Sequence, residues 1–330
     1  MDKLASAYPS QPSPAGIASR VATARYATGV GYCTAATVSF GLMFPVMQRA
    51  LQRLDPFSFT SLRYLLAAAV MIAVLALKEG RPALRVAGRP LFAAWLLGSA
   101  GFAGFGFLVF LGQKMAGPQG ALNTSILAAT QPLFGALIHS AMTRRLAPWT
   151  TWSCFLLSFC GVALVISNGN PAGLLGAPGS LVSSAITIAG MLCWVIYSFG
   201  SARFPDWSPM RYTTITMALG VTSIVAINLS LFATGLVAPP TGQAVVDTLP
   251  ELLYMSLGAG VVGVSLWNAG NRLLTPINAV LFLNVPTITA FAVSALTDIV
   301  PTPIQIAGAC LTCVALVLNN LLARRQAART

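Results

Sequence analysis

The sequence predicts an all-α integral membrane protein with ten transmembrane helices, arranged as two inverted five-helix repeats. Three observations support this fold class: the composition, a series of ten long apolar segments, and residues that recur roughly 154 positions apart. Of the 330 residues, 56% are hydrophobic and only 8% are charged, and the mean hydropathy is +0.77. A soluble domain carries about a quarter charged residues and cannot bury so much apolar surface. Most of the chain is therefore expected to lie in lipid.

Ten apolar segments are each long enough to cross a bilayer, which takes about 20 residues. Proline, glycine or charged residues bound each segment. Several segments begin on a proline, whose missing N–H is not needed in a first helical turn, as at Pro56, Pro90 and Pro303. In chain order the predicted helices are residues 27–47, 56–77, 90–111, 120–141, 149–166, 180–199, 212–234, 251–269, 277–296 and 303–322.

The basic residues predict how the helices are oriented. With the N-terminus in the cytoplasm, 15 of the 19 Lys and Arg residues fall in cytoplasmic segments and three on the opposite face, while Arg63 lies within the second helix. Cytoplasmic loops of membrane proteins carry such an excess. We therefore expect a multi-pass protein of the inner membrane with both termini in the cytoplasm. The net charge of +12 then indicates a lipid bilayer as partner and no nucleic acid.

Similar residues recur at a nearly constant distance along the chain. The pairs are Phe40 with Trp194 and Pro132 with Pro286 at 154 positions, Pro56 with Pro209 at 153, and Gly101 with Gly258 and Gly106 with Gly263 at 157. Each unit then holds five helices, and an odd number forces the second unit to insert upside down. Inverted repeats are typical of transporters, which bind substrate near the midplane between the two copies.

The repeat sets the predicted domain boundaries. Residues 1–25 are rich in Ser, Pro and Ala and have no apolar run, so they are expected to form a disordered cytoplasmic tail. The first repeat is predicted to cover residues 26–168 with helices one to five, and the second residues 180–322 with helices six to ten. Residues 323–330 form the predicted cytoplasmic C-terminal tail.

Several short motifs accompany this pattern: Phe40-Gly41, Asp55-Pro56, Leu62-Arg63-Tyr64, Pro132-Leu133-Phe134 and Cys193-Trp194. With these motifs, residues 27–322 resemble the EamA-like families of the drug/metabolite transporter superfamily. The resemblance implies a ten-helix exporter whose central cavity is lined by helices one, three, four, six, eight and nine. The family often has a Glu after helices four and nine, where this chain has Arg144-Arg145 and, slightly displaced, Asp298. A function that depends on that Glu is not expected here.

Two helix faces carry residues that are poorly suited to lipid. Hydroxyls, Met and Trp follow one another at three- or four-residue steps in helix six, and a similar stripe occurs in helix one. Such stripes line a cavity or serve ordinary helix packing, and both interpretations stay open. The predicted substrate-binding residues on these stripes and on helices four, eight and nine are Phe40, Phe44, Asn123, Gln131, Trp194, Tyr197, Ser198, Trp267 and Asn284.

Pro132 and Pro286 are predicted to kink helices four and nine near midspan. Each proline removes an intrahelical hydrogen bond and frees a carbonyl, which either makes a hinge with polar groups or merely bends the helix. For Arg63, just inside the outer end of helix two, we expect the side chain to reach the headgroups or to pair with Asp55.

These features favour an exporter of a small amphipathic metabolite that works by alternating access, with amino acids or related compounds implied first by the family resemblance. The alternatives are efflux of drugs or nucleotide derivatives and, from another class, a membrane-embedded enzyme acting on a lipid-linked substrate. The sequence has no HExxH, GxSxG or intramembrane aspartate pair. We therefore expect no enzyme, no catalytic residue, no metal and no cofactor. A small-molecule substrate is the expected partner of a protein that works as a monomer.

Overall fold

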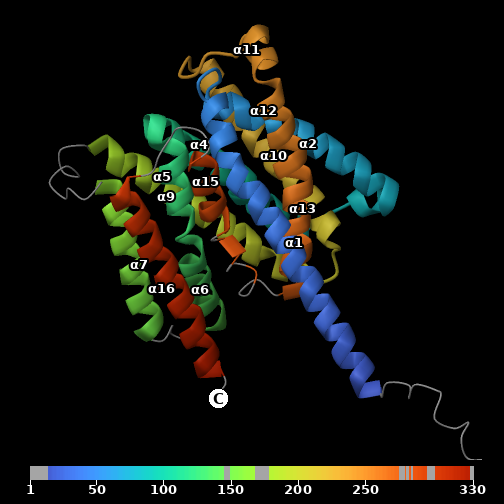
Figure 1. Ribbon diagram of the computed structural model, residues 1–330. Helices are drawn as coiled ribbons and strands as arrows, with labels where there is room; N and C mark the ends of the chain where they lie inside the picture. The colour runs from blue at the N-terminus through green and yellow to red at the C-terminus, as the bar shows by residue number, and fades with distance from the viewer. Residues whose placement is uncertain are drawn as a thin grey trace, which may run out of the picture.

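The computed structural model describes residues 14–144, 149–167, 178–274, 279, 282–283, 285–295 and 302–327 (Figure 1). These residues form helices and no strand, which confirms the predicted all-α class. The first half contains α1 (Pro14–Ala50), α2 (Pro56–Lys78), η1 (Arg81–Leu84), α3 (Arg89–Gly98), η2 (Ser99–Gly104), α4 (Phe105–Met115), η3 (Gly117–Gln119), α5 (Gly120–Ala128), α6 (Gln131–Thr143) and α7 (Trp149–Ser167). The second half contains α9 (Pro178–Gly200), η4 (Ser201–Arg203), α10 (Pro209–Ala233), α11 (Gly242–Asp247), α12 (Leu249–Leu253), η5 (Tyr254–Gly263), α13 (Val264–Leu274), α15 (Val285–Ala295) and α16 (Pro303–Ala327).

Seven helical stretches of the described chain are long and apolar enough to cross a membrane. They are Ala24–Ala50, Pro56–Lys78, Arg89–Met115, Gly117–Thr143, Leu181–Arg203, Pro209–Ala233 and Leu249–Leu274. Shorter apolar helices, Trp152–Gly161 and Pro303–Ala315, stand where helices five and ten were predicted. Much of the predicted helix nine lies outside the described residues. The chain is thus a multi-pass membrane protein, and the count of ten stays a prediction.

Three of the membrane stretches are not simple α-helices. Between α3 and α4, and between α12 and α13, the chain winds as the π-helices η2 and η5. They contain glycines of the predicted repeat pairs, Gly101 in η2 and Gly258 and Gly263 in η5. The predicted fourth helix is divided into α5 and α6 at residues 129–130, just before Pro132. Wide turns and breaks of this kind inside membrane helices occur where the backbone is buried in protein.

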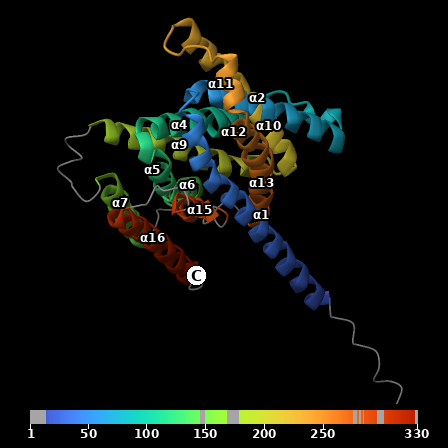
Figure 2. The ribbon, with the colours of Figure 1, turned by 45° about the horizontal axis from the view of Figure 1, so that its top comes forward.

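The helices pack mainly in pairs around the centre of the molecule. Helix α1 runs against α13 and α15, α4 against α9, and α2 against α10. Helices α7 and α16 form a pair at one edge of the bundle, visible as the green and red helices in Figures 1 and 2. At the crossing of α3 and α10, a Cβ on Gly98 would overlap the carbonyl oxygen of Thr216, so the two backbones lie in direct contact. The central helices thereby enclose a buried interior.

The two ends of the chain differ from the predicted tails. Helix α1 begins at Pro14, so residues 14–25 are helical and the prediction of a disordered tail over that range is wrong. Four alanines in this range favour helix, and continuing an existing helix avoids the cost of nucleation. Helix α16 likewise runs past residue 322 to Ala327. The start of α1 and the end of α16 lie on the same side of the bundle in both views (Figures 1 and 2).

Candidate functional site

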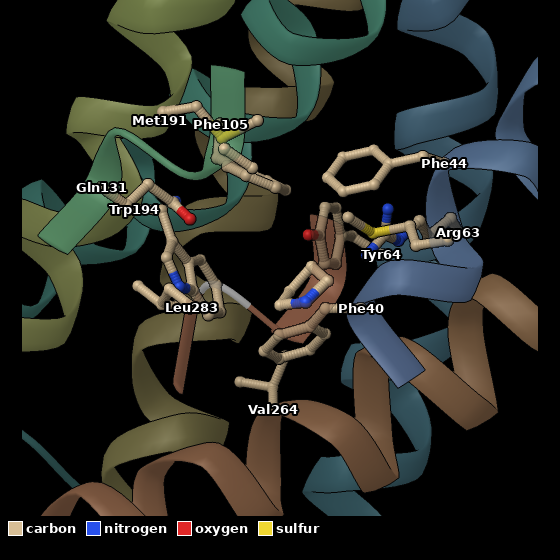
Figure 3. Close-up of a pocket in the computed structure, with 13 residues that line it drawn as sticks. Phe40, Phe44, Arg63, Tyr64, Phe105, Gln131, Met191, Trp194, Val264 and Leu283 are labelled. Carbon is tan, nitrogen blue, oxygen red and sulfur yellow. The ribbon is translucent and has the colours of Figure 1, made fainter. Parts of the chain in front are cut away.

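A narrow cavity of about 20 Å³ lies among the central helices. Its lining comes from both halves of the chain, including α1, α2, α4, α9, α13 and α15 (Figure 3). The described residues that line it are Phe40, Met43, Phe44, Arg63, Tyr64, Phe105, Ala128, Gln131, Met191, Trp194, Val264, Leu283 and Pro286. Each helix that the family resemblance implied as part of the cavity contributes a lining residue. The predicted second helix also contributes, through Arg63 and Tyr64. The walls are therefore apolar and aromatic, with a few polar groups among them.

Aromatic rings from opposite halves of the chain meet in the cavity wall. The centroids of Phe40 and Trp194 are 5.5 Å apart and their planes stand at 84°, an edge-to-face contact. Phe105 lies 5.3 Å from Trp194 on the other side. Trp194 is only 4% exposed. Phe40 on α1 and Trp194 on α9 are partners in the predicted repeat, and the two halves of the wall touch at their rings.

Three predicted binding residues, Tyr197, Ser198 and Trp267, are buried behind this wall. The indole N–H of Trp267 donates to the hydroxyl of Ser198 at 3.0 Å, and that hydroxyl donates to the carbonyl of Trp194 at 2.9 Å. Asn268 donates through Nδ2 to the hydroxyl of Tyr197 at 2.7 Å. The three side chains thus hold the wall in position and do not line the cavity.

Gln131 is placed in the cavity by the break in the fourth membrane stretch. Helix α5 ends at Ala128 and α6 begins at Gln131, whose side chain is 3% exposed. In Figure 3 Gln131 and Trp194 lie on one side of the cavity and Arg63 on the other. The hydroxyl of Thr287, beside Pro286, donates to the carbonyl of Ser125 at 2.6 Å and ties α15 to α5.

The two prolines occupy helix beginnings and not helix interiors. Pro132 is in the first turn of α6 and Pro286 in the first turn of α15. The expected midspan kink of helix four is a break between two helices, because proline fits a first turn without losing a hydrogen bond. A hinge role for both prolines stays a prediction.

Two of the predicted binding residues, Asn123 and Asn284, are not among the described lining residues of the cavity. Asn123 is half-buried and does not line the cavity, and its Oδ1 has no hydrogen-bond partner among the described residues. Asn284 lies outside the residues that the structure describes.

Arg63 contradicts the expectation placed on it. Its side chain is 2% exposed and lines the central cavity, so it does not reach the headgroups. Asp55 is not its partner, because that carboxylate caps α2 by accepting the backbone N–H groups of Phe57 and Ser58, both at 2.9 Å. The guanidinium carbon instead lies 4.5 Å from the ring centroid of Tyr64 and 5.4 Å from that of Phe110.

The sequence contained a signal for this residue that the prediction did not use. A charged side chain inside a membrane helix is costly, and most such residues face the bundle interior or a water-filled cavity. Arg63 is the basic residue that the predicted topology places within a membrane helix, seven positions after the start of α2 at Pro56. Tyr64, Met43, Phe105 and other apolar lining residues carried no comparable signal.

Comparisons with known proteins agree with this architecture. Residues 27–167 match the EamA-like transporter family. The uncharacterized transporter YrdR of Bacillus subtilis is 29% identical over 296 residues, 89% of this chain and 91% of that protein. The uncharacterized transporter YyaM of the same organism is 28% identical over 255 residues, 76% of this chain and 79% of that protein.

A protein of known crystal structure superposes with a TM-score of 0.61 at 21% identity, over 89% of this chain and 98% of that one, so the two share a fold. The motifs that suggested a family in the sequence fall in large part within the matched range of 27–167. Over residues 27–167 the chain is therefore similar to the EamA-like transporter family.

Proposed function

We propose that this protein is an inner-membrane transporter that exports a small amphipathic metabolite, an amino acid or related compound, by alternating access. Ten helices in two inverted five-helix repeats, with both termini in the cytoplasm, form the proposed framework. The observation that carries the proposal is the central cavity, whose lining comes from both halves of the chain and whose rings meet at Phe40 and Trp194. Inverted-repeat transporters bind substrate at such a junction.

The pattern of helix packing supports the inverted repeat. The sequence shift pairs α1 with α9, α4 with α13 and α6 with α15. If each helix is replaced by its repeat partner, the α1–α13 contact becomes a contact between α9 and α4, which the structure contains. In the same way the α1–α15 contact becomes the observed contact between α9 and α6. The shift also pairs α2 with α10 and α7 with α16, so the contacts within these two pairs are unchanged by the exchange. A two-fold relation between the halves produces this pattern of exchange.

The π-helices give independent support for the repeat. Gly101 in η2 and Gly258 in η5 are predicted repeat partners, and each lies within a π-helical segment of its membrane stretch. The cavity-lining residues Phe105 and Val264 follow directly after these segments. Because π-helices are rare, their occurrence at matching positions in both halves favours a common origin of the two units.

The relatives support transport as the activity. YrdR and YyaM are both described as transporters, and each aligns with more than three quarters of this chain. The apolar, aromatic cavity suits a small molecule with an apolar body, as most small-molecule sites do.

Solute flux across a sealed membrane tests the proposal. Culture media of cells with and without the protein are first compared for small molecules, and compounds enriched by the protein are then measured as radiolabelled counterflow in proteoliposomes. Counterflow that requires both the protein and a sealed vesicle is expected. Chemical turnover of a lipid-linked substrate in detergent, without flux in vesicles, would favour a membrane-embedded enzyme instead.

A further inference from the structure

Arg63 is a buried cation whose charge has no counterpart in the described protein. Its Nε and Nη1 atoms are buried and have no hydrogen-bond partner among the residues that the structure describes. Among the described lining residues of the central cavity, Arg63 alone carries a formal charge. Figure 3 shows its guanidinium at the cavity, near Tyr64 and Phe44 and opposite Trp194.

No carboxylate of the described residues is hydrogen-bonded to Nε or Nη1 of Arg63. Asp55 caps α2, Glu79 accepts the hydroxyl of Ser208 at 2.5 Å, and Asp247 accepts the amide of Gln243 at 2.7 Å. The partly buried Glu251 has one carboxylate oxygen without any partner, so it does not neutralise Arg63 through that atom. The rings of Tyr64 and Phe110 offer only cation–π contacts.

Such a group is expensive to keep without a function. An unpaired charge in a low-dielectric interior lowers stability, and cation–π contacts offset only part of that cost. Guanidinium N–H donors match the oxygens of a carboxylate in geometry and charge, and such charge-assisted hydrogen bonds are the strong ones. The unsatisfied donors at the cavity therefore point to an anion that arrives with the ligand.

The surroundings limit the anion to a single negative charge. The other described lining residues are aromatic, aliphatic or Met side chains, a proline and the neutral amide of Gln131. A phosphate ester or a nucleotide would bring a second charge with no second cation to receive it. The aromatic wall at Phe40, Phe105 and Trp194 instead suits an apolar body.

Arg63 also distinguishes one half of the cavity from the other. Its predicted repeat partner, 153 positions later, is Thr216 on α10, so the second half carries no charge at the matching position. A bound acidic group would therefore lie on the α2 side, and the ligand would take one orientation between the two repeats.

We propose that Arg63 binds the carboxylate of the transported molecule, and that the substrates are small organic acids with one negative charge and an aromatic or branched aliphatic body. This inference rests on the proposed transport function and specifies its substrate class.

The test compares acids with their own amides. Purified protein in detergent is heated with phenylacetate or phenylacetamide, with indole-3-acetate or indole-3-acetamide, and with L-phenylalanine or its amide, and the melting midpoint is followed against ligand concentration. At least one acid is expected to stabilise the wild type at about 10- to 100-fold lower concentration than its amide, the range typical of a charge-assisted hydrogen bond. If no acid exceeds its amide, the inference is wrong.

Variants assign the preference to Arg63. In Arg63→Gln the difference between acid and amide should disappear, while Arg63→Lys should retain part of it. The matched control is Arg49→Gln, which removes an exposed arginine near the outer end of α1 and should behave as the wild type. Without ligand, Arg63→Gln should melt at the same or a higher temperature, because an unpaired charge has been removed. A lower melting temperature in Arg63→Gln without ligand, with the difference between acid and amide unchanged in that variant, would identify Arg63 as a structural cation.

Flux separates this inference from the proposed function. Proteoliposomes are loaded with a mixture of metabolites below about 1 kDa, and released compounds are sorted by charge with mass spectrometry. Release of monocarboxylates supports both proposals. Protein-dependent release only of compounds that lack a carboxylate would leave transport standing and overturn the role of Arg63, whereas an acid preference in melting without any release would retain the site and overturn transport.

Discussion

Phe40 and Trp194 join the two halves of the molecule at the wall of the cavity. Edge-to-face ring contacts of this kind contribute about 0.5–1.5 kcal/mol beyond the burial of their area. The contact is modest, so a ligand with an apolar ring or chain can replace it without a large loss. We therefore expect both side chains to contact substrate, with Trp194 giving the larger share because its indole also packs on Phe105 and Tyr197.

Replacing Trp194 with Ala should lower counterflow at least about tenfold, equivalent to about 1.4 kcal/mol of lost interaction. Flux per folded protein in proteoliposomes measures the effect, with gel filtration as the check on folding. The control is Trp95→Ala on α3, which removes a partly exposed indole that contacts Phe92 and does not line the cavity. Normal flux in Trp194→Ala, or loss of folded protein in that variant alone, would assign Trp194 to packing.

The sequence predicted which helices face the cavity better than which residues do. Phe40 and Trp194 could be predicted from the sequence because the repeat and the helical stripes both indicated them. The same stripe also selected Ser198, which lies behind the wall, because three- and four-residue steps cover a wide arc and do not show where its centre points. The position of Arg63 depends on how α2 is rotated against α10, and that rotation comes from packing between distant segments.

Among the helices, the crossing of α3 and α10 has the least room for change. Gly98→Ala places a methyl group on the backbone of Thr216, so the two helices must separate. We expect a loss of about 1–3 kcal/mol or failure to fold, as for other overpacked interiors. The control is Gly31→Ala on α1, where nothing lies within 4 Å of the added atom and a helical alanine gains about 1 kcal/mol. Thermal melting in detergent distinguishes them, and equal midpoints would contradict the close crossing.

The two first-turn prolines should matter for motion more than for folding. Pro132→Ala and Pro286→Ala keep a helix-compatible residue at the start of α6 and α15, so melting midpoints should change little. If these breaks let the helices move against each other, the continuous helix favoured by Ala should alter flux. Unchanged flux in both variants would leave the prolines as structural helix starts.

Length and hydropathy were sufficient to locate the seven membrane stretches of the described chain, but not their internal form. The glycines of η2 and η5 entered the predicted repeat, and nothing in their composition separates a π-helix from an α-helix with small residues. The break before Pro132 was anticipated as a kink because proline has the same sequence signature in a first turn and in a bend.

At the scale of the molecule, the start of α1 at Pro14 and the end of α16 at Ala327 lie on one side of the bundle. The basic residues predict that this side is the cytoplasm. A reporter that fluoresces only in the cytoplasm, fused after Thr330, should therefore be bright. An expressed but dark fusion would overturn the predicted orientation, and a fusion at the N-terminus should give the same brightness because α1 begins and α16 ends on one side.

The long first helix has a mechanical consequence. Helix α1 has 37 residues, about 55 Å at 1.5 Å each, against a hydrocarbon core of about 30 Å. Phe40 in the cavity wall and Pro14 at the helix start are therefore joined by a rod of about 39 Å. A tilt of about 10° at the level of Phe40 would displace the start of such a rod by about 7 Å. A small rotation of α1 at the cavity wall would thus appear at Pro14 as a displacement large enough to follow with a distance label.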